Sequence, residues 1–101
     1  TVALCFNYGG QQEIVDAARA LAASKQPITE ESLAQSLYHP DVPPIDIIVR
    51  TSGEQRLSNF MLWRSAYSEL FFLDKFWPEM TPDDVTAILN EYTRRVRRFG
   101  Q

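Results

Sequence analysis

Two arginines and a serine lie close together in the middle of the chain and could bind a phosphate group. Arg50, Arg56 and Ser58 fall within nine positions, and a loop that bends at Gly53 would bring them together. Guanidinium groups hold phosphate oxygens through forked, charge-assisted hydrogen bonds. Ser52, Ser58 and backbone amides near Gly53 could satisfy further oxygens. The alternative is an exposed loop with surface ion pairs of little energy, and the pattern alone leaves both interpretations open.

An acidic residue lies near each of these arginines in the sequence, four positions before Arg50 and two positions before Arg56. Asp46 precedes Arg50, and Glu54 precedes Arg56. Carboxylates so near could hold the guanidinium groups in place by ion pairing, or they could contribute oxygen ligands to a metal ion. The pattern alone leaves both roles open for Asp46 and Glu54.

The arginine-rich loop follows a short apolar run that predicts a strand buried on both faces, Ile45–Val49. Two further strands are predicted at Val2–Phe6 and Glu69–Phe72. Strands that alternate with helical patterns are typical of an α/β fold with a parallel sheet flanked by helices. Ligands of such sheets usually bind beyond the carboxyl ends of the strands. The polar loops after Phe6 and Val49 both lie at such ends.

Helical patterns separate the predicted strands and follow the last of them. From Gln11 to about Ala23, apolar residues recur with the spacing of one helix face. Thr29 can cap a short helix, and the apolar cluster Phe60–Trp63 predicts another. Thr81, followed by Pro and two acids, marks a strong helix start, and that helix is predicted to run to Gly100 and to pack on the sheet. The apolar positions of the first and last helices are Ile14, Ala17, Ala18 and Leu21, then Val85, Ile88, Leu89, Tyr92, Val96 and Phe99.

Composition limits the possible classes of protein. The chain has 101 residues, 45% of them hydrophobic and 23% charged, which suits one globular domain at most. A net charge of −3 argues against nucleic acid as a partner. The single cysteine, Cys5, lies in the apolar run VALCF and is expected to be a buried, inert thiol in a reducing compartment. Because the chain opens directly in strand-like sequence, we expect it to be a fragment.

The segment RTSGEQRLSNFMLWRSAYSELFF, residues 50–72, closely resembles the signature near the C-terminal end of cis-prenyltransferases. These are the undecaprenyl and other (Z)-polyprenyl diphosphate synthases. The motif NYGG near the N-terminus, FWP before the last helix and RRFG at the end of the chain agree in the same order. The resemblance implies the C-terminal portion, about two-fifths, of a larger single-domain α/β fold.

The resemblance also implies a reaction and roles for the central residues. Isopentenyl diphosphate would be condensed repeatedly onto an allylic diphosphate, such as farnesyl or geranyl diphosphate, with Mg²⁺, to supply a polyprenyl carrier lipid. Arg50, Arg56 and Ser58 would hold the diphosphate of isopentenyl diphosphate. Glu69, in AYSELFF, would help to coordinate magnesium. Asp46 and Glu54 match acids of the family that affect activity, more plausibly through positioning than through direct chemistry.

Two further elements match the family in this chain. Asn7, Gly9 and Gly10 belong to the NYGG element that lines the cleft of the family, although Gln, Gln and Glu follow here where many bacterial members have Arg, Trp and Asp. Arg98 and Gly100 match an Arg-x-Gly element that reaches across a dimer interface toward the isopentenyl diphosphate site. The arginines near the chain end could alternatively complement the C-terminus of the last helix.

The Asp-Gly-Asn-Gly-Arg-Trp segment, which supplies the catalytic magnesium-binding Asp and the allylic phosphate loop of the family, is absent from these 101 residues. They would therefore carry the isopentenyl diphosphate half-site alone and be inactive in isolation. We expect the parent protein to be a cytoplasmic homodimer, or peripheral at the inner face of the membrane, whose product partitions to the membrane. The alternatives are a non-catalytic partner subunit, which usually loses the middle-loop arginines, and an unrelated phosphate-binding module, for which no P-loop or GxGxxG is present.

Overall fold

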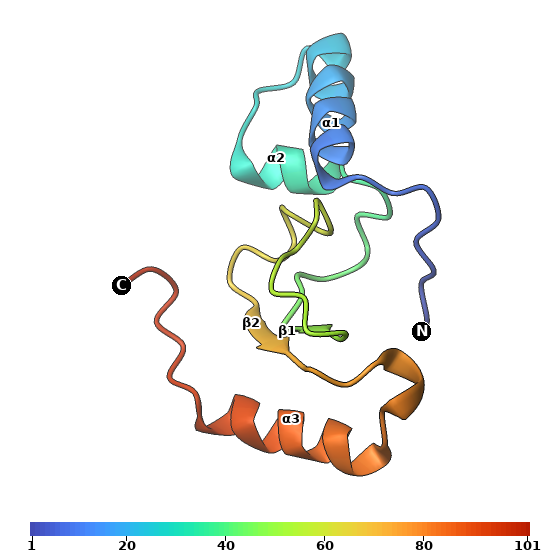
Figure 1. Ribbon diagram of the computed structural model, residues 1–101. Coiled ribbons are helices and arrows are strands. Elements are labelled where there is room, and N and C mark those ends of the chain that lie inside the picture. Colours follow the sequence, from blue (N-terminus) through green and yellow to red (C-terminus); the bar gives the residue numbers. More distant parts are fainter. The chain divides into compact units, whose positions relative to one another are not determined.

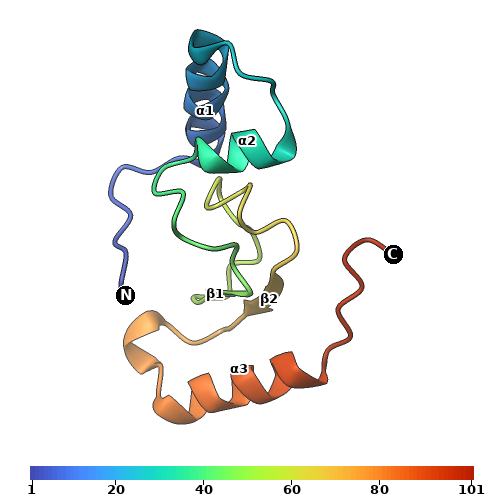
Figure 2. The same cartoon turned by 180° about the vertical axis from the view of Figure 1, so that it is seen from behind.

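The computed structural model describes all of residues 1–101 (Figures 1 and 2). The chain forms two compact units. Unit 1 consists of Thr1–Pro44 and Leu57–Ala66, and unit 2 consists of Ile45–Arg56 and Tyr67–Gln101. No helix in the structure is long and apolar enough to cross a lipid bilayer.

Unit 1 is built on two helices, α1 (Gly10–Ser24) and α2 (Glu30–Gln35), and α2 lies crosswise near one end of α1 (Figure 1). Thr29 caps α2 as predicted, because its hydroxyl accepts a hydrogen bond from the Ser32 backbone N–H. The core of the unit consists of Ala17, Leu21, Leu33 and Leu37, with Ile14, Ala18 and Trp63 packed against it. The apolar stripe predicted for the first helix is therefore confirmed as the face that α1 buries.

Unit 2 contains a two-stranded parallel sheet of β1 (Ile47–Arg50) and β2 (Glu69–Phe72). Ile47 pairs with Glu69, and the register continues to the last residues of both strands. Ile48 and Phe71 are the buried side chains of the sheet. The predicted parallel pairing of these two strands is confirmed.

A short 3₁₀ turn, η1 (Trp77–Glu79), leads to α3 (Pro82–Arg94). Thr81 caps α3 as predicted, and its hydroxyl accepts from the Asp84 backbone N–H. The helix ends earlier than the sequence predicted, because Arg95 adopts an extended conformation. Only Ile88 of the helix is buried, and Arg95, just beyond it, lies 4.0 Å from the centroid of the Phe71 ring, which fixes the helix end to β2.

Three further sequence predictions are wrong for this structure. Val2–Phe6 forms no strand, because a strand needs a hydrogen-bonded neighbour and none lies beside this segment. Cys5, predicted to be buried, is consequently exposed. The segment Phe60–Trp63, predicted to be helical, forms turns, because Met61 has a left-handed φ of 51° that interrupts helical backbone.

Candidate functional site

The loop after β1 brings Arg50 and Arg56 together within unit 2. Arg50, the last residue of β1, donates a hydrogen bond from Nη1 to the backbone oxygen of Arg56 over 3.1 Å. The turn between them depends on Ser52 and Gly53, which both have a φ of 71°, a left-handed conformation that favours glycine. The loop therefore presents two guanidinium groups at the carboxyl end of a parallel strand.

The backbone amides of this turn are already used. The N–H of Ser52 donates to the Lys75 oxygen over 2.8 Å, and the N–H of Gly53 donates to the Leu73 oxygen over 2.9 Å. The expectation that amides near Gly53 bind an anion is wrong for these two groups, since they extend the pairing between the strands. An anion at this loop would therefore have to be held by side chains rather than by these two amides.

The two candidate acids have different partners. Glu54 forms an ion pair with Arg56, and both side chains are largely exposed. The Asp46 carboxylate lies 3.6 Å from Nη1 of Arg97, in the segment after α3, and its side chain is 71% exposed. Glu54 can therefore orient one arginine of the loop, whereas Asp46 pairs with an arginine of the C-terminal segment.

Glu69, the predicted magnesium ligand, begins β2 and pairs with Arg95. Its Oε2 lies 3.2 Å from Nη1 of Arg95, which also donates to the Leu70 oxygen over 3.1 Å. No three His, Cys, Asp or Glu side chains of the chain gather as a metal site. Mg²⁺ is commonly held by one or two carboxylates together with substrate phosphates and water. The Glu69 carboxylate fits that donor chemistry, but it lies at the amino end of β2, opposite Ile47, whereas the arginine loop follows the carboxyl end of β1.

The other predicted site residues divide between the two units. Asn7, Gly9, Gly10 and Ser58 belong to unit 1. Arg98 and Gly100 belong to the C-terminal end of unit 2, where Arg98 is exposed and its backbone oxygen accepts from Gln101. Within unit 2, the two loop arginines are joined by a hydrogen bond. Ser58 belongs to unit 1, as do the residues from Asn7 to Gly10.

Unit 1 contains a buried ion pair that the sequence analysis did not predict. Glu13 and Arg64 are 1% and 6% exposed, and Nη1 of Arg64 donates to Oε2 of Glu13 over 2.6 Å. The same carboxylate accepts from the Tyr8 hydroxyl over 2.5 Å and from the Tyr38 backbone N–H over 3.1 Å. Burial, and then the hydrogen bond to Glu13, raise the pKa of the Tyr8 hydroxyl, which therefore remains a donor. The oxygens of Tyr38 and His39 accept from Nη2 of Arg64, which completes the network.

Asn59 is a second residue that sequence reasoning missed. Its side-chain oxygen accepts a hydrogen bond from the Gln11 N–H over 2.8 Å, and its backbone oxygen accepts from the Gly10 N–H over 2.7 Å. The only signal in the sequence is that asparagine tolerates left-handed backbone better than most residues, and its φ is 66°.

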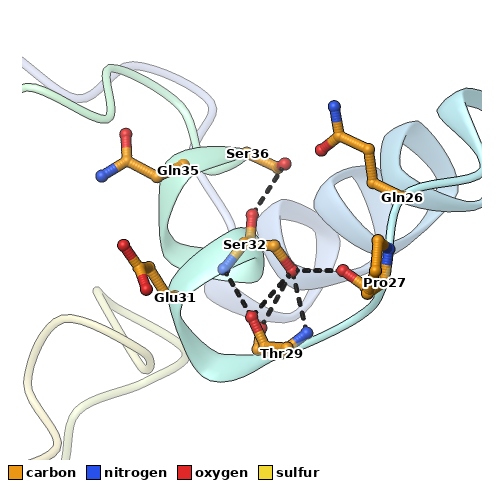
Figure 3. Close-up of a pocket in the computed structure, with 7 residues that line it drawn as sticks. All are labelled: Gln26, Pro27, Thr29, Glu31, Ser32, Gln35 and Ser36. Carbon is orange, nitrogen blue, oxygen red and sulfur yellow. Dashed lines mark hydrogen bonds between the residues drawn. The ribbon is translucent and has the colours of Figure 1, made fainter.

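A shallow depression of about 650 Å³ lies beside α2 (Figure 3). The side chains around it are polar, and Figure 3 shows Ser32 bonded to the backbone of Pro27 and Thr29. The hydroxyls of Thr29, Ser32 and Ser36 are all engaged in hydrogen bonds within α2 and the turn before it. Its lining is Gln26, Pro27, Thr29, Glu31, Ser32, Gln35 and Ser36.

Comparison with known proteins gives consistent results. Residues 1–100 match the family described as "Putative undecaprenyl diphosphate synthase". An isoprenyl transferase from Thermotoga maritima is 50% identical over 105 residues, which cover 99% of this chain and 45% of that protein. This chain therefore spans less than half the length of that relative.

Two solved structures share the fold. A structure described as a "probable undecaprenyl diphosphate synthase" from Campylobacter jejuni has a TM-score of 0.88 and 34% identity, covering 95% of this chain and 45% of that one. Lavandulyl diphosphate synthase from Lavandula x intermedia, in complex with dimethylallyl diphosphate, has a TM-score of 0.81 and 38% identity, covering 93% of this chain and 44% of that one. The small parallel sheet with helices matches the α/β fold of these proteins.

Proposed function

Because the chain belongs to the undecaprenyl diphosphate synthase family of prenyltransferases, we propose that it is the C-terminal part of a cis-prenyltransferase and holds isopentenyl diphosphate. The whole protein would condense isopentenyl diphosphate onto an allylic diphosphate. The observation that supports this role best is the loop after β1, in which Arg50 bonds the backbone of Arg56.

Each group of the loop has a distinct task in this proposal. The guanidinium groups of Arg50 and Arg56 hold the diphosphate through charge-assisted hydrogen bonds, and Glu54 orients Arg56. The Ser58 hydroxyl, two positions beyond Arg56, donates to a further oxygen. Holding both substrates in a fixed geometry removes much of the entropic barrier to forming a carbon–carbon bond.

Magnesium, held by Glu69 and the substrate phosphates, would supply charge stabilisation for the departing diphosphate. Until it binds, Arg95 neutralises the Glu69 carboxylate. We expect Glu69→Gln to raise the magnesium concentration that half-maximal activity requires, because a ligand charge is lost while the shape is kept. A magnesium titration equal to that of wild type would remove Glu69 from the site.

The proposal includes a homodimer in which Arg98 and Gly100 approach the partner's isopentenyl diphosphate site. The exposed position of Arg98 leaves it free to do so. Sedimentation of the whole protein as a monomer at the concentration of the activity assay would exclude this part of the proposal.

The central experiment replaces each loop arginine in the whole protein. Arg50→Ala and Arg56→Ala should each weaken isopentenyl diphosphate binding by about 1.5–3 kcal/mol, the scale of a hydrogen bond to a charged group. The KM for isopentenyl diphosphate and its Kd by calorimetry measure this loss. Arg94→Ala is the matched control, because that side chain is 78% exposed and pairs only with Glu91 on its own helix. Unchanged constants in both loop variants would contradict the assignment.

A further inference from the structure

We propose that Asn59 is a positioning residue that fastens the loop carrying Ser58 to the first turn of α1. The inference rests on the proposed function, because Ser58 is one of the groups assigned to isopentenyl diphosphate. Asn59 touches no substrate in this proposal and acts through the backbone on either side of it.

The first turn of α1 lacks a cap from its own sequence. The residue at its N-cap position is Gly9, which has no side chain to accept a bond from the helix amides. The amides that begin a helix have no partner within it. Asn59, 48 positions away from Gln11, accepts the Gln11 N–H with its side chain, and its backbone oxygen accepts the Gly10 N–H. It performs from another segment the task that Ser, Thr, Asp or Asn usually performs locally.

The two glycines before Gln11 permit this approach. A Cβ atom at Gly10 would lie 2.8 Å from the backbone oxygen of Asn59 and 2.9 Å from Cγ of Leu62. A Cβ atom at Gly9 would lie 3.1 Å from Nδ2 of Asn59. The glycine pair thus has a packing role here, since a side chain at Gly10 would push the loop away from the helix.

The loop around Asn59 has an unfavourable backbone conformation that other contacts must stabilise. Ser58, Asn59 and Met61 have φ values of 50°, 66° and 51°, in the left-handed region that residues other than glycine seldom occupy. Such conformations persist where the surroundings fix them. The two bonds from α1 to Asn59 provide that fixation, and Ser58 is the residue directly before it. The direction of the Ser58 side chain therefore depends on Asn59.

The far end of the same segment is held independently. Arg64 is buried and bonded to Glu13 of α1, with a distance of 2.6 Å between Nη1 and Oε2. Removal of the Asn59 side chain should therefore loosen the front of the segment, including Ser58, without releasing the whole of it. This separates a positioning role from a general loss of folding.

Three variants of the whole protein test the proposal. Asn59→Gly keeps the left-handed backbone and removes the cap. Asn59→Asp keeps both the oxygen acceptor and a residue type that tolerates this backbone. Asn90→Gly makes the same change on the exposed side of α3, in the other unit, as the control. The measurements are hydrogen exchange of the Gln11 amide, binding of isopentenyl diphosphate by calorimetry, and steady-state kinetics.

We expect Asn59→Gly to speed exchange at Gln11 about fivefold, the factor that corresponds to a lost helix cap. The KM and Kd for isopentenyl diphosphate should rise at least as much, while the KM for the allylic substrate stays unchanged. Asn59→Asp should restore both, and Asn90→Gly should alter neither.

Wild-type exchange at Gln11 in Asn59→Gly would show that there is no cap and overturn the inference. Faster exchange at Gln11 with an unchanged KM and Kd for isopentenyl diphosphate would also overturn it, because the cap would then have no effect on substrate binding. A wild-type protein that binds no isopentenyl diphosphate would instead refute the proposed function, and exchange at Gln11 would still judge the cap separately.

Discussion

At the scale of single residues, unit 1 contains a buried ion pair of Glu13 and Arg64. Two charges removed from water are costly unless hydrogen bonds satisfy their remaining atoms. Here Tyr8, the Tyr38 N–H and the oxygens of Tyr38 and His39 provide those bonds. The pair therefore specifies how α1, the connector after α2 and the segment around Arg64 fit together.

Loss of one partner should be severe. Glu13→Ala should lower the free energy of unfolding by about 3–5 kcal/mol, because Arg64 would remain buried without its counter-charge. Urea unfolding of the whole protein, followed by circular dichroism, measures the loss. Glu31→Ala, at an exposed position of α2, is the control and should change stability by less than about 0.5 kcal/mol.

The double variant Glu13→Leu, Arg64→Leu should lose much less than the sum of the two single variants, because no unpaired charge remains in the interior. Additive losses would contradict the view that the two side chains act as a pair.

At the scale of elements, local signals in the sequence correctly predicted the starts of α2 and α3 and the buried face of α1. Thr29 and Thr81 each cap the helix that follows, and in both cases the residue at the third helical position completes the capping box. The periodic apolar positions around Leu21 likewise predicted α1. These features could be predicted because their partners lie within a few residues along the chain.

Contacts between distant segments could not be predicted in this way. The strand Val2–Phe6 fails because strands form only with a neighbour, whatever their composition. The bond between Gln11 and Asn59 and the pair of Glu13 and Arg64 join residues 48 and 51 positions apart. For the candidate site, the sequence indicated Arg50 and Arg56 through their charge, whereas Asn59 acts through geometry that its type alone does not reveal.

The stability of the first turn of α3 should decrease at low pH, because Asp84 becomes protonated. Hydrogen bonds from Nζ of Lys75, and then from the backbone N–H of Thr81, lower the pKa of the Asp84 carboxyl. An acid with a lowered pKa stabilises the fold above its unfolded pKa of about 3.9, and that stabilisation is lost as the pH falls through the lowered value.

Asp84→Asn should therefore reduce the difference in unfolding midpoint between about pH 6 and about pH 2, because the residue no longer titrates. Thermal unfolding at the two pH values measures this difference. Asp83→Asn, which removes a neighbouring charge of the same turn, should retain more of the wild-type difference. An equal difference in wild type and Asp84→Asn would exclude Asp84 as a source of the pH dependence.

At the scale of the whole molecule, the most exposed apolar segment is the one that was predicted to be a strand. Val2, Leu4 and Phe6 are 86%, 74% and 84% exposed. Under the proposal that the chain is the C-terminal part of a larger α/β fold, this segment gains a strand neighbour in the whole protein. Cys5, in its middle, provides a chemical probe of that change.

Alkylation of Cys5 by iodoacetamide should be at least about tenfold slower in the native whole protein than in the same protein unfolded in urea, because a buried thiol reacts only after local opening. Mass spectrometry of the peptide that contains Cys5 gives the rate. Equal rates in the native and unfolded states would mean that the segment stays exposed and would count against the larger sheet.

The division of the chain between the two units has a consequence for synthesis on the ribosome. In the sequence, the segment Leu57–Ala66 of unit 1 comes after β1 and before β2, the two strands of unit 2. Glu13 therefore has no ion-pair partner until Arg64, 51 residues later in the chain, has been synthesised. Unit 1 has all its residues once Ala66 is added, and the sheet has its second strand once Phe72 is added. Unit 1 thus has all its residues before unit 2, which is complete only with Gln101. A pause before Arg64 would leave Glu13 of the nascent helix α1 without its ion-pair partner.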